Sequence, residues 1–423
     1  MQARSWTAES GRKAPPERGT VASILNKALW GTALCVAFLA TSAQAEDARA
    51  DRTSLAQARL TATLVDRLQA TAQDNVVVSP VGIAAAFTLL DLGTSESYRE
   101  SARKVLGFAA DRAAAVDFED LRDAITGLGR SSDAGAAQFS FANAAVFDPK
   151  LRLADDVVSR MRETRAEVSI RPLSDHATVD AINGWVAEKT RGLIPTIVDD
   201  GLANARLVVL NALYFKDDWA VAFNKAQTRV AAFHGAGGAS TEVPMMAGRM
   251  TMPFRSDGRF AAIDLRYKSD RFSLVLLTTR DQPATFPEFA SAVGWLSGDG
   301  FEPADVSLQM PRFTLRQTLD VLPALDHAGL AEARHDPAAF APMTPDPVDI
   351  SAILQKIYLG INEQGTEAAA VTSVIVRTAA VAPHVKTDTL TFDRPFMFAL
   401  RDHVTGLILL SGYLGRMPDT VTQ

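Results

Sequence analysis

The stretch from Asn362 to Ala380 constrains the fold of this chain more than any other. Read with the two-residue period of a β-strand, one face of the stretch carries no charge, and it consists of Thr366, Ala368, Ala370, Thr372, Val374, Val376 and Thr378. The stretch starts after Gly365, and Pro383 follows it, so its local sequence does not fix it as a strand. The pattern predicts a segment that is first a loop and later a strand with one buried face.

The N-terminal residues have the pattern of a secretory signal peptide. Basic residues, among them Lys13 and Lys27, precede an apolar run from about Ala28 to Ala40, and small residues end at Ala45 in an A-x-A pattern. The run is short for a bilayer span, which disfavours an uncleaved membrane anchor. We therefore expect residues 1–45 to be removed and residues 46–423 to form a single domain.

The composition of the expected mature chain excludes several classes of partner. Removing five basic and two acidic residues with the signal peptide leaves 38 Lys and Arg against 47 Asp and Glu, a net charge of −9. The single cysteine, Cys35, lies within the removed segment. An acidic chain without a basic tract is a poor binder of nucleic acid, and no mature segment is apolar enough to span a membrane. We expect a monomer that is exported, to the periplasm or to the extracellular space.

Helical periodicity predominates in the first part of the chain and strand patterns in the second. Helices are expected over residues 54–72, 81–92, 98–106, 179–191 and 319–328. Strands are expected over residues 75–78, 137–147, 207–214, 243–246, 250–254, 261–265, 272–278, 306–310, 313–315, 396–401 and 407–414. With little alternation of strands and helices, this order predicts one mixed α+β domain with antiparallel-rich sheets.

No constellation for catalysis or metal binding occurs in the sequence. It has no H-E-x-x-H, no G-x-S-x-G, no phosphate-binding loop and no cysteine pair, and its six histidines are scattered. We therefore expect neither an enzyme nor a cofactor. Asn211, the only polar residue in the apolar run from Leu207 to Tyr214, indicates instead a buried hydrogen-bond network.

Several long motifs resemble those of the serpin family, in the family's order and over nearly the whole mature chain. The matching segments are Asn75–Pro80, Asn183–Ile194, Asn211–Phe223, Phe233–His234, Val243–Met246, Ile361–Ala370, Asp393–Phe398 and Leu407–Gly412. Ile361–Ala370, I-N-E-Q-G-T-E-A-A-A, is the most specific, because it is close to the family's hinge sequence V-N-E-E-G-T-E-A-A-A.

The resemblance implies a serpin fold, with about nine helices, three β-sheets and an exposed reactive-centre loop at about residues 363–385. It also implies a suicide-substrate inhibitor of serine proteases, in which the cleaved loop inserts into the main sheet while the protease remains attached as an acyl-enzyme. The residues that match the hinge are Glu363, Gly365, Thr366, Glu367, Ala368, Ala369 and Ala370.

The family's hinge spacing places the scissile bond between Ala379 and Ala380. A small residue before the bond favours an elastase-like protease as the target. Arg377 is a rival position, and cleavage after it would indicate a trypsin-like target.

Two departures concern the buried region beneath the main sheet, called the shutter in the family. Gly82 stands where the family often has serine, and Gln355 stands where it often has histidine. Glutamine both donates and accepts, so it is able to form a network with Ser79 and Asn211. Trp219 matches the family position at the end of the sheet where insertion starts, and a core tryptophan is the simpler interpretation of the same residue.

Two functional hypotheses remain open. The uncharged face of the hinge favours an inhibitor that forms a covalent complex with a serine protease. The alternative is a non-inhibitory serpin that acts as a binding or chaperone-like protein, whose loop would be cleaved without a gain in thermal stability.

Overall fold

The computed structural model describes residues 52–68, 75–107, 118–128, 137–280, 289–366 and 386–418, all within one compact unit, Arg49–Gln423. The predicted signal peptide, residues 1–45, lies outside the described residues. None of the described helices is both long enough and apolar enough to cross a bilayer.

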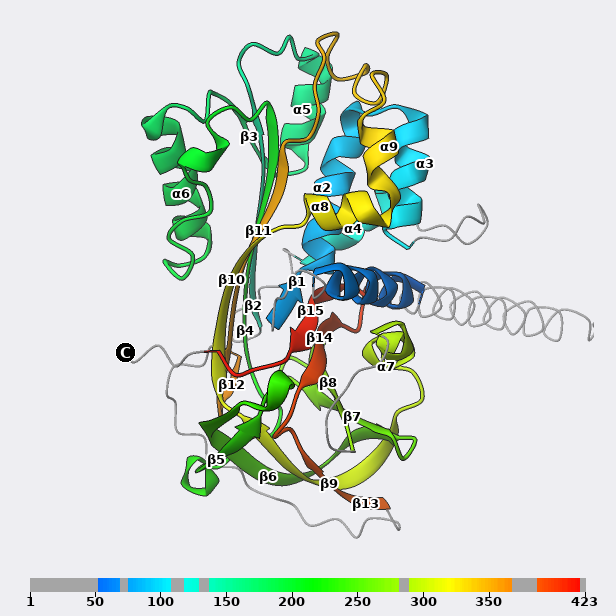
Figure 1. The fold of residues 1–423 in the computed structure, drawn as a ribbon, viewed down its shortest axis with the longest axis vertical. Coiled ribbons are helices and arrows are strands. Elements are labelled where there is room, and N and C mark those ends of the chain that lie inside the picture. The colour runs from blue at the N-terminus through cyan, green and yellow to red at the C-terminus, as the bar shows by residue number, and fades with distance from the viewer. Residues whose placement is uncertain are drawn as a thin grey trace, which may run out of the picture. The chain divides into compact units, whose positions relative to one another are not determined.

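A six-stranded sheet forms the long central layer of this unit (Figure 1). Its strand order is β10–β11–β12–β4–β2–β3. The bounds are β2 (Gln138–Phe147), β3 (Glu167–Ile170), β4 (Leu207–Asp218), β10 (Phe313–Asp320), β11 (Ala352–Ile361) and β12 (Gly365–Thr366). The first nine residues of β4 are all buried, as expected for a strand covered on both faces.

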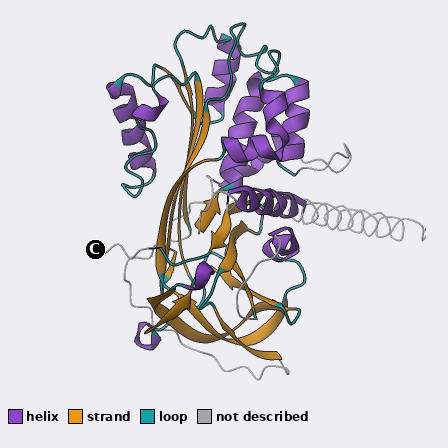
Figure 2. Cartoon of the chain, viewed as in Figure 1, coloured by secondary structure: helices purple, strands orange, loops and turns teal. Residues whose placement is uncertain are grey.

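Helices cover the two faces of this sheet (Figures 1 and 2). Helix α6 (His176–Lys189) lies on one face, where Val179, Ile182 and Val186 pack on small residues of β2 and β4. Helix α2 (Pro80–Leu90) lies on the other face and is buried along its whole length. Ser79 is its N-cap, and Pro80, which lacks an N–H group, occupies the first helical position.

The remaining helices are shorter or lie nearer the surface. The helix over residues 52–68 precedes α3 (Glu96–Val105), α4 (Phe118–Leu128) and α5 (Asp155–Glu163). Further along the chain are α7 (Val293–Leu296), α8 (Leu322–Leu325) and α9 (Ala331–Arg334).

The other strands form a second hydrogen-bonded sheet, of nine strands, in the order β1–β15–β14–β8–β7–β6–β9–β13, with β5 paired to β6. The bounds are β1 (Asn75–Val78), β5 (Arg229–His234), β6 (Ser240–Ser256), β7 (Phe260–Arg266), β8 (Phe272–Thr279), β9 (Glu302–Pro311), β13 (Lys386–Thr391), β14 (Phe396–Asp402) and β15 (Ile408–Leu414). Three sheets were expected, but the described strands form two. Strand β6 continues through both expected strands, 243–246 and 250–254, and pairs with β5 and with β9, so all of these strands belong to one sheet.

The mixed α+β architecture with mostly antiparallel pairings is confirmed. One expected boundary is wrong: residues 319–320 end strand β10, and helix α8 begins only at Leu322. The strand is longer because every residue from Phe313 to Asp320 pairs with β11. That pairing joins residues far apart in the sequence, so the local hydrophobic periodicity does not predict it.

Candidate functional site

Strands β11 and β4 pair directly along part of their length, and this pairing is called the seam below. It is parallel and runs from Ala352 opposite Val208 to Ile357 opposite Leu213. Beyond Ile357, the short strand β12 lies between the two, antiparallel to both. Gly365 and Thr366, the first strand residues of the predicted hinge, therefore occupy one end of the sheet between β11 and β4 (Figure 1).

A tight turn at Asn362 carries the chain from β11 into β12. The Asn362 side-chain oxygen accepts hydrogen bonds from the backbone N–H groups of Gln364 at 2.9 Å and of Gly365 at 3.3 Å. At Gly365, a Cβ atom would lie 2.1 Å from the carbonyl oxygen of Asp217. Only glycine lets the hinge approach β4 this closely.

Trp219 holds this turn from the side of β4. Its backbone N–H donates to the carbonyl of Gln364 at 2.7 Å, and its indole N–H donates to the carbonyl of Asn362 at 2.9 Å. The indole is buried and stacks on Tyr267, with ring centroids 4.5 Å apart. Trp219 is thus both a core residue and a direct contact of the turn between β11 and β12.

Thr366 is the last described residue of the hinge, and its side chain is buried. The hydroxyl groups of Thr366 and Tyr267 lie 2.5 Å apart and share a hydrogen bond. Burial raises the pKa of Tyr267, which keeps its hydroxyl protonated. A small polar side chain suits this position, because a buried hydroxyl needs a partner.

Glu363 is a buried carboxylate, 2% exposed, at the start of the predicted reactive loop. It accepts a hydrogen bond from the Thr228 hydroxyl at 2.8 Å and one from the Arg312 guanidinium at 3.4 Å. Its carbonyl accepts from the N–H of Phe223 at 2.8 Å. Because a buried charge is costly without partners, these contacts hold the turn between β11 and β12 in place.

Asp217 is a second buried carboxylate at this end of the sheet, opposite Thr366 in the β4–β12 pairing. Burial raises the pKa of the Asp217 carboxyl, and the Ser269 hydroxyl, which donates to it at 2.5 Å, partly opposes that rise. The hinge therefore enters the sheet beside a carboxylate that is poorly solvated.

Beneath the seam, Gln355 of β11 and Ser79 of the α2 N-cap form a reciprocal pair. The Ser79 backbone N–H donates to the Gln355 side-chain oxygen at 3.0 Å, and the Gln355 side-chain nitrogen donates to the Ser79 carbonyl at 2.8 Å. The Ser79 hydroxyl donates to the carbonyl of Leu409 at 2.7 Å. Gln355 thus ties the seam to helix α2 and, through Ser79, to β15.

Asn211 lies opposite Gln355 across the seam, but its amide donates to Asn143 of β2 at 2.8 Å. The expected network is therefore split into two pairs, Ser79–Gln355 and Asn143–Asn211. Gly82 makes room for both, because a Cβ atom there would lie 2.0 Å from the Asn211 side-chain oxygen and 2.7 Å from the Gln355 side-chain nitrogen. The Asn211 oxygen has no hydrogen-bond partner among the described residues.

Part of the predicted site lies outside the described residues. This holds for the hinge residues Glu367, Ala368, Ala369 and Ala370, the bond between Ala379 and Ala380, and the rival Arg377. The roles assigned to these residues, and to the hinge and shutter residues described above, stay predictions.

Three contacts of the site were missed in the sequence. Asn143 shares the expected strand 137–147 with two other polar residues, Gln138 and Ser140, so it does not stand out there as Asn211 does in its own strand. Tyr267 and Arg312 carry no comparable signal, because their partners Thr366 and Glu363 are far away in the sequence. Among the described residues, no cluster of acidic, histidine or cysteine side chains suits a metal ion.

This geometry defines a protein whose large sheet receives the first residues of a following loop between two of its strands. A family model described as "Serpin (serine protease inhibitor)" matches residues 55–416, and the chain belongs to the serpin family.

Individual relatives are distant but extend over most of the chain. The chain is 26% identical to neuroserpin of Rattus norvegicus over 84% of its own length and 89% of that protein's. It is 26% identical to plasminogen activator inhibitor 1 of Bos taurus over 82% and 87% of the two lengths. The structure of Serpin48 of the insect Tenebrio molitor, at 22% identity, superposes with a TM-score of 0.73 over 87% of this chain and 98% of that one, which confirms the serpin fold.

Proposed function

We propose that this serpin is a suicide-substrate inhibitor of serine proteases. The catalytic serine of the protease attacks the loop carbonyl before the scissile bond, the amine of the next residue leaves, and the acyl-enzyme ester forms. The cut loop then inserts between β11 and β4 before the ester is hydrolysed.

The entry of β12 into the sheet is the observation that carries this proposal. Gly365 and Thr366 already pair with β4, at Asp218 and Asp217, beyond the last pair of the seam, which is Ile357 with Leu213. Each further inserted residue replaces a pairing of the parallel seam with two antiparallel pairings, which are more stable per residue. About fifteen residues at ~3.3 Å each would carry the attached protease roughly 50 Å.

The native state of such a protein is kinetically trapped, because the complete sheet is more stable than the sheet with a seam. Cleavage releases the loop from its second attachment and allows insertion. The alternation of Thr366, Ala368, Ala370 and Thr372 supports this step, because the face that would be buried is small and uncharged.

The proposed scissile bond is Ala379–Ala380, which favours an elastase-like target, with Arg377 and a trypsin-like target as the rival. The name of the related plasminogen activator inhibitor 1 supports inhibition as such. The apolar run and the A-x-A pattern before Glu46 support export. We propose that the exported protein is a monomer in the periplasm or outside the cell.

The decisive experiment incubates the protein with elastase-like, chymotrypsin-like and trypsin-like serine proteases in turn. We expect an SDS-stable complex with an elastase-like protease and a released C-terminal peptide that begins at Ala380. A peptide that begins at Thr378 would establish Arg377 as the residue before the bond. Cleavage by all three proteases without a complex and without a gain in thermal stability would contradict inhibition and favour the non-inhibitory alternative.

A further inference from the structure

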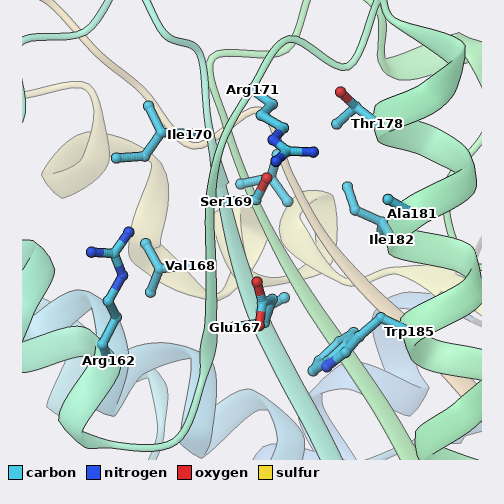
Figure 3. Close-up of a pocket in the computed structure, with 12 residues that line it drawn as sticks. Arg162, Glu167, Val168, Ser169, Ile170, Arg171, Thr178, Ala181, Ile182 and Trp185 are labelled. Carbon is cyan, nitrogen blue, oxygen red and sulfur yellow. The ribbon is translucent and has the colours of Figure 1, made fainter.

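A cavity of about 410 Å³ lies between helix α6 and the edge strand β3 (Figure 3). Its floor is apolar and includes Ala144 of β2 and Ile182 of α6. Glu167, Ser169 and Arg171 lie along β3 and just after it, on the side that faces α6, and Trp185 faces them from the helix (Figure 3). The size lies within the range of small-molecule sites, as does the combination of an apolar floor with a few polar groups.

The polar groups around this cavity are unused within the protein. In the described part of the chain, no hydrogen bond or ion pair engages the side chains of Glu167, Ser169 or Arg171. The indole of Trp185 is half-buried and its N–H likewise has no acceptor there. Two cations (Arg162 and Arg171), one carboxylate (Glu167) and the Ser169 hydroxyl therefore line the cavity around an apolar floor without neutralising one another.

The backbone of β3 offers a second set of unused groups. In the described sheet, β3 is the last strand and pairs only with β2. Ser169 and Ile170 point to opposite faces of the sheet, yet both line the cavity, so it extends to the open edge of the strand. A peptide bound in this cavity in an extended conformation reaches the open edge of β3, where the backbone N–H and C=O groups have no strand partner in the described sheet.

We propose that this cavity binds a short apolar peptide with free ends, extended parallel to β3. Its ammonium group pairs with Glu167 beside the Trp185 ring, where a cation is favoured, and its carboxylate pairs with Arg171. The four residues of β3 extend about 13 Å, which suits a peptide of three or four residues. Its apolar side chains lie on Ala144 and Ile182.

The test uses isothermal titration calorimetry of the whole protein with the tetrapeptide alanyl-leucyl-leucyl-alanine. Its C-terminal amide and its N-acetyl form remove one end charge each. We expect the peptide with free ends to bind at least tenfold more tightly than either capped form. Binding that is absent, or equal within twofold among the three peptides, overturns the proposal.

Two variants assign the charges. Arg171→Gln should weaken binding of the free peptide at least fivefold and leave binding of the amide unchanged, and Glu167→Gln should do the same with the N-acetyl form. Arg165→Gln and Glu163→Gln are matched controls, because both side chains are exposed and neither lines the cavity. Equal effects of the variants and their controls overturn the assignment, and thermal unfolding of each variant verifies that it is folded.

Discussion

The hydroxyl groups of Tyr267 and Thr366 lie 2.5 Å apart at one end of the large sheet, so the last described hinge residue is hydrogen-bonded to a buried residue that directly follows strand β7. The Tyr267 ring also stacks on Trp219, which donates to the turn before the hinge. Tyr267 therefore connects the hinge to the core. Its hydroxyl is the group that contacts Thr366, so this hydrogen bond depends on the position of Thr366 in β12.

Tyr267→Phe should loosen the hinge without disturbing the ring stack. Loss of the shared hydrogen bond leaves the Thr366 hydroxyl buried and unpaired, which costs about 1–3 kcal/mol. We expect a lower thermal midpoint and faster hydrogen exchange of the Thr366 amide. Tyr98→Phe is the control, because the buried Tyr98 hydroxyl has no partner among the described residues, and its removal should not lower the midpoint.

Thr366→Arg should convert the protein from an inhibitor into a substrate. The Thr366 side chain is 1% exposed, and an arginine there would bury a charge beside Tyr267, at a cost of several kcal/mol. Gel analysis after incubation with the cognate protease should show cleaved protein in place of the SDS-stable complex. Val230→Arg, at an exposed position of β5, should leave complex formation intact. An unchanged yield of complex with Thr366→Arg would refute the burial of this face during inhibition.

Gly82→Ala should destabilise the native state through the seam. The added Cβ atom would lie 2.0 Å from the Asn211 side-chain oxygen, and relief of this overlap costs about 1–3 kcal/mol. Asn211→Ala should cost less in the Gly82→Ala background than in the wild type, which a double-mutant cycle in thermal midpoint measures. Gly184→Ala in helix α6 is the control, because nothing lies within 4 Å of its Cβ position, and alanine should stabilise the helix. Strictly additive effects at Gly82 and Asn211 would argue against the overlap.

Asp217→Asn should stabilise the native protein at neutral pH. Burial raises the pKa of the Asp217 carboxyl above its ordinary value of 3.8, so the folded state binds this proton more tightly than the unfolded state does. Ionisation of Asp217 therefore lowers the free energy of unfolding as the pH rises through the raised pKa. This destabilisation disappears below pH 3.8, where the carboxyl is protonated in both states. The gain from Asp217→Asn should be present at pH 7 and shrink as the pH approaches 4. Asp218→Asn, an exposed neighbour, should show no such pH-dependent gain.

The sequence pattern predicted those features of the site that depend on local spacing. The period-two face that begins at Thr366 predicts a strand with small buried side chains; Thr366, its only described member, is buried in β12, and burial of the rest stays a prediction. The single Asn211 in an apolar strand predicted a buried hydrogen-bond network with Ser79 and Gln355, but its amide donates to Asn143 instead. Both inferences needed only the alternation of a strand and the cost of an unpaired buried amide.

The remaining features depend on long-range packing. The space that Gly82 provides for Asn211 joins residues 129 positions apart in the sequence, and the contact of Arg312 with Glu363 joins residues 51 apart. Strand β6 was expected as two strands because glycine, here Gly248, is typical of turns. Gly248 instead pairs with Leu308 of β9, and the strand is continuous. Local propensity does not determine such contacts.

The pairing of β1 with β15 has a consequence for the order in which the chain can fold. Val78 lies opposite Ser411, the Ser79 backbone N–H donates to Gln355 of β11, and the Ser79 hydroxyl donates to the carbonyl of Leu409 in β15. During synthesis, β1, α2 and β4 leave the ribosome long before β11 and β15, so β1 and the α2 N-cap Ser79 lack their partners in those late strands, whereas β4 already has β2. An N-terminal fragment that ends before residue 352 would contain neither the seam nor the Ser79 anchor. The seam and the contacts of Ser79 are therefore completed only when the last strands of the chain have been made.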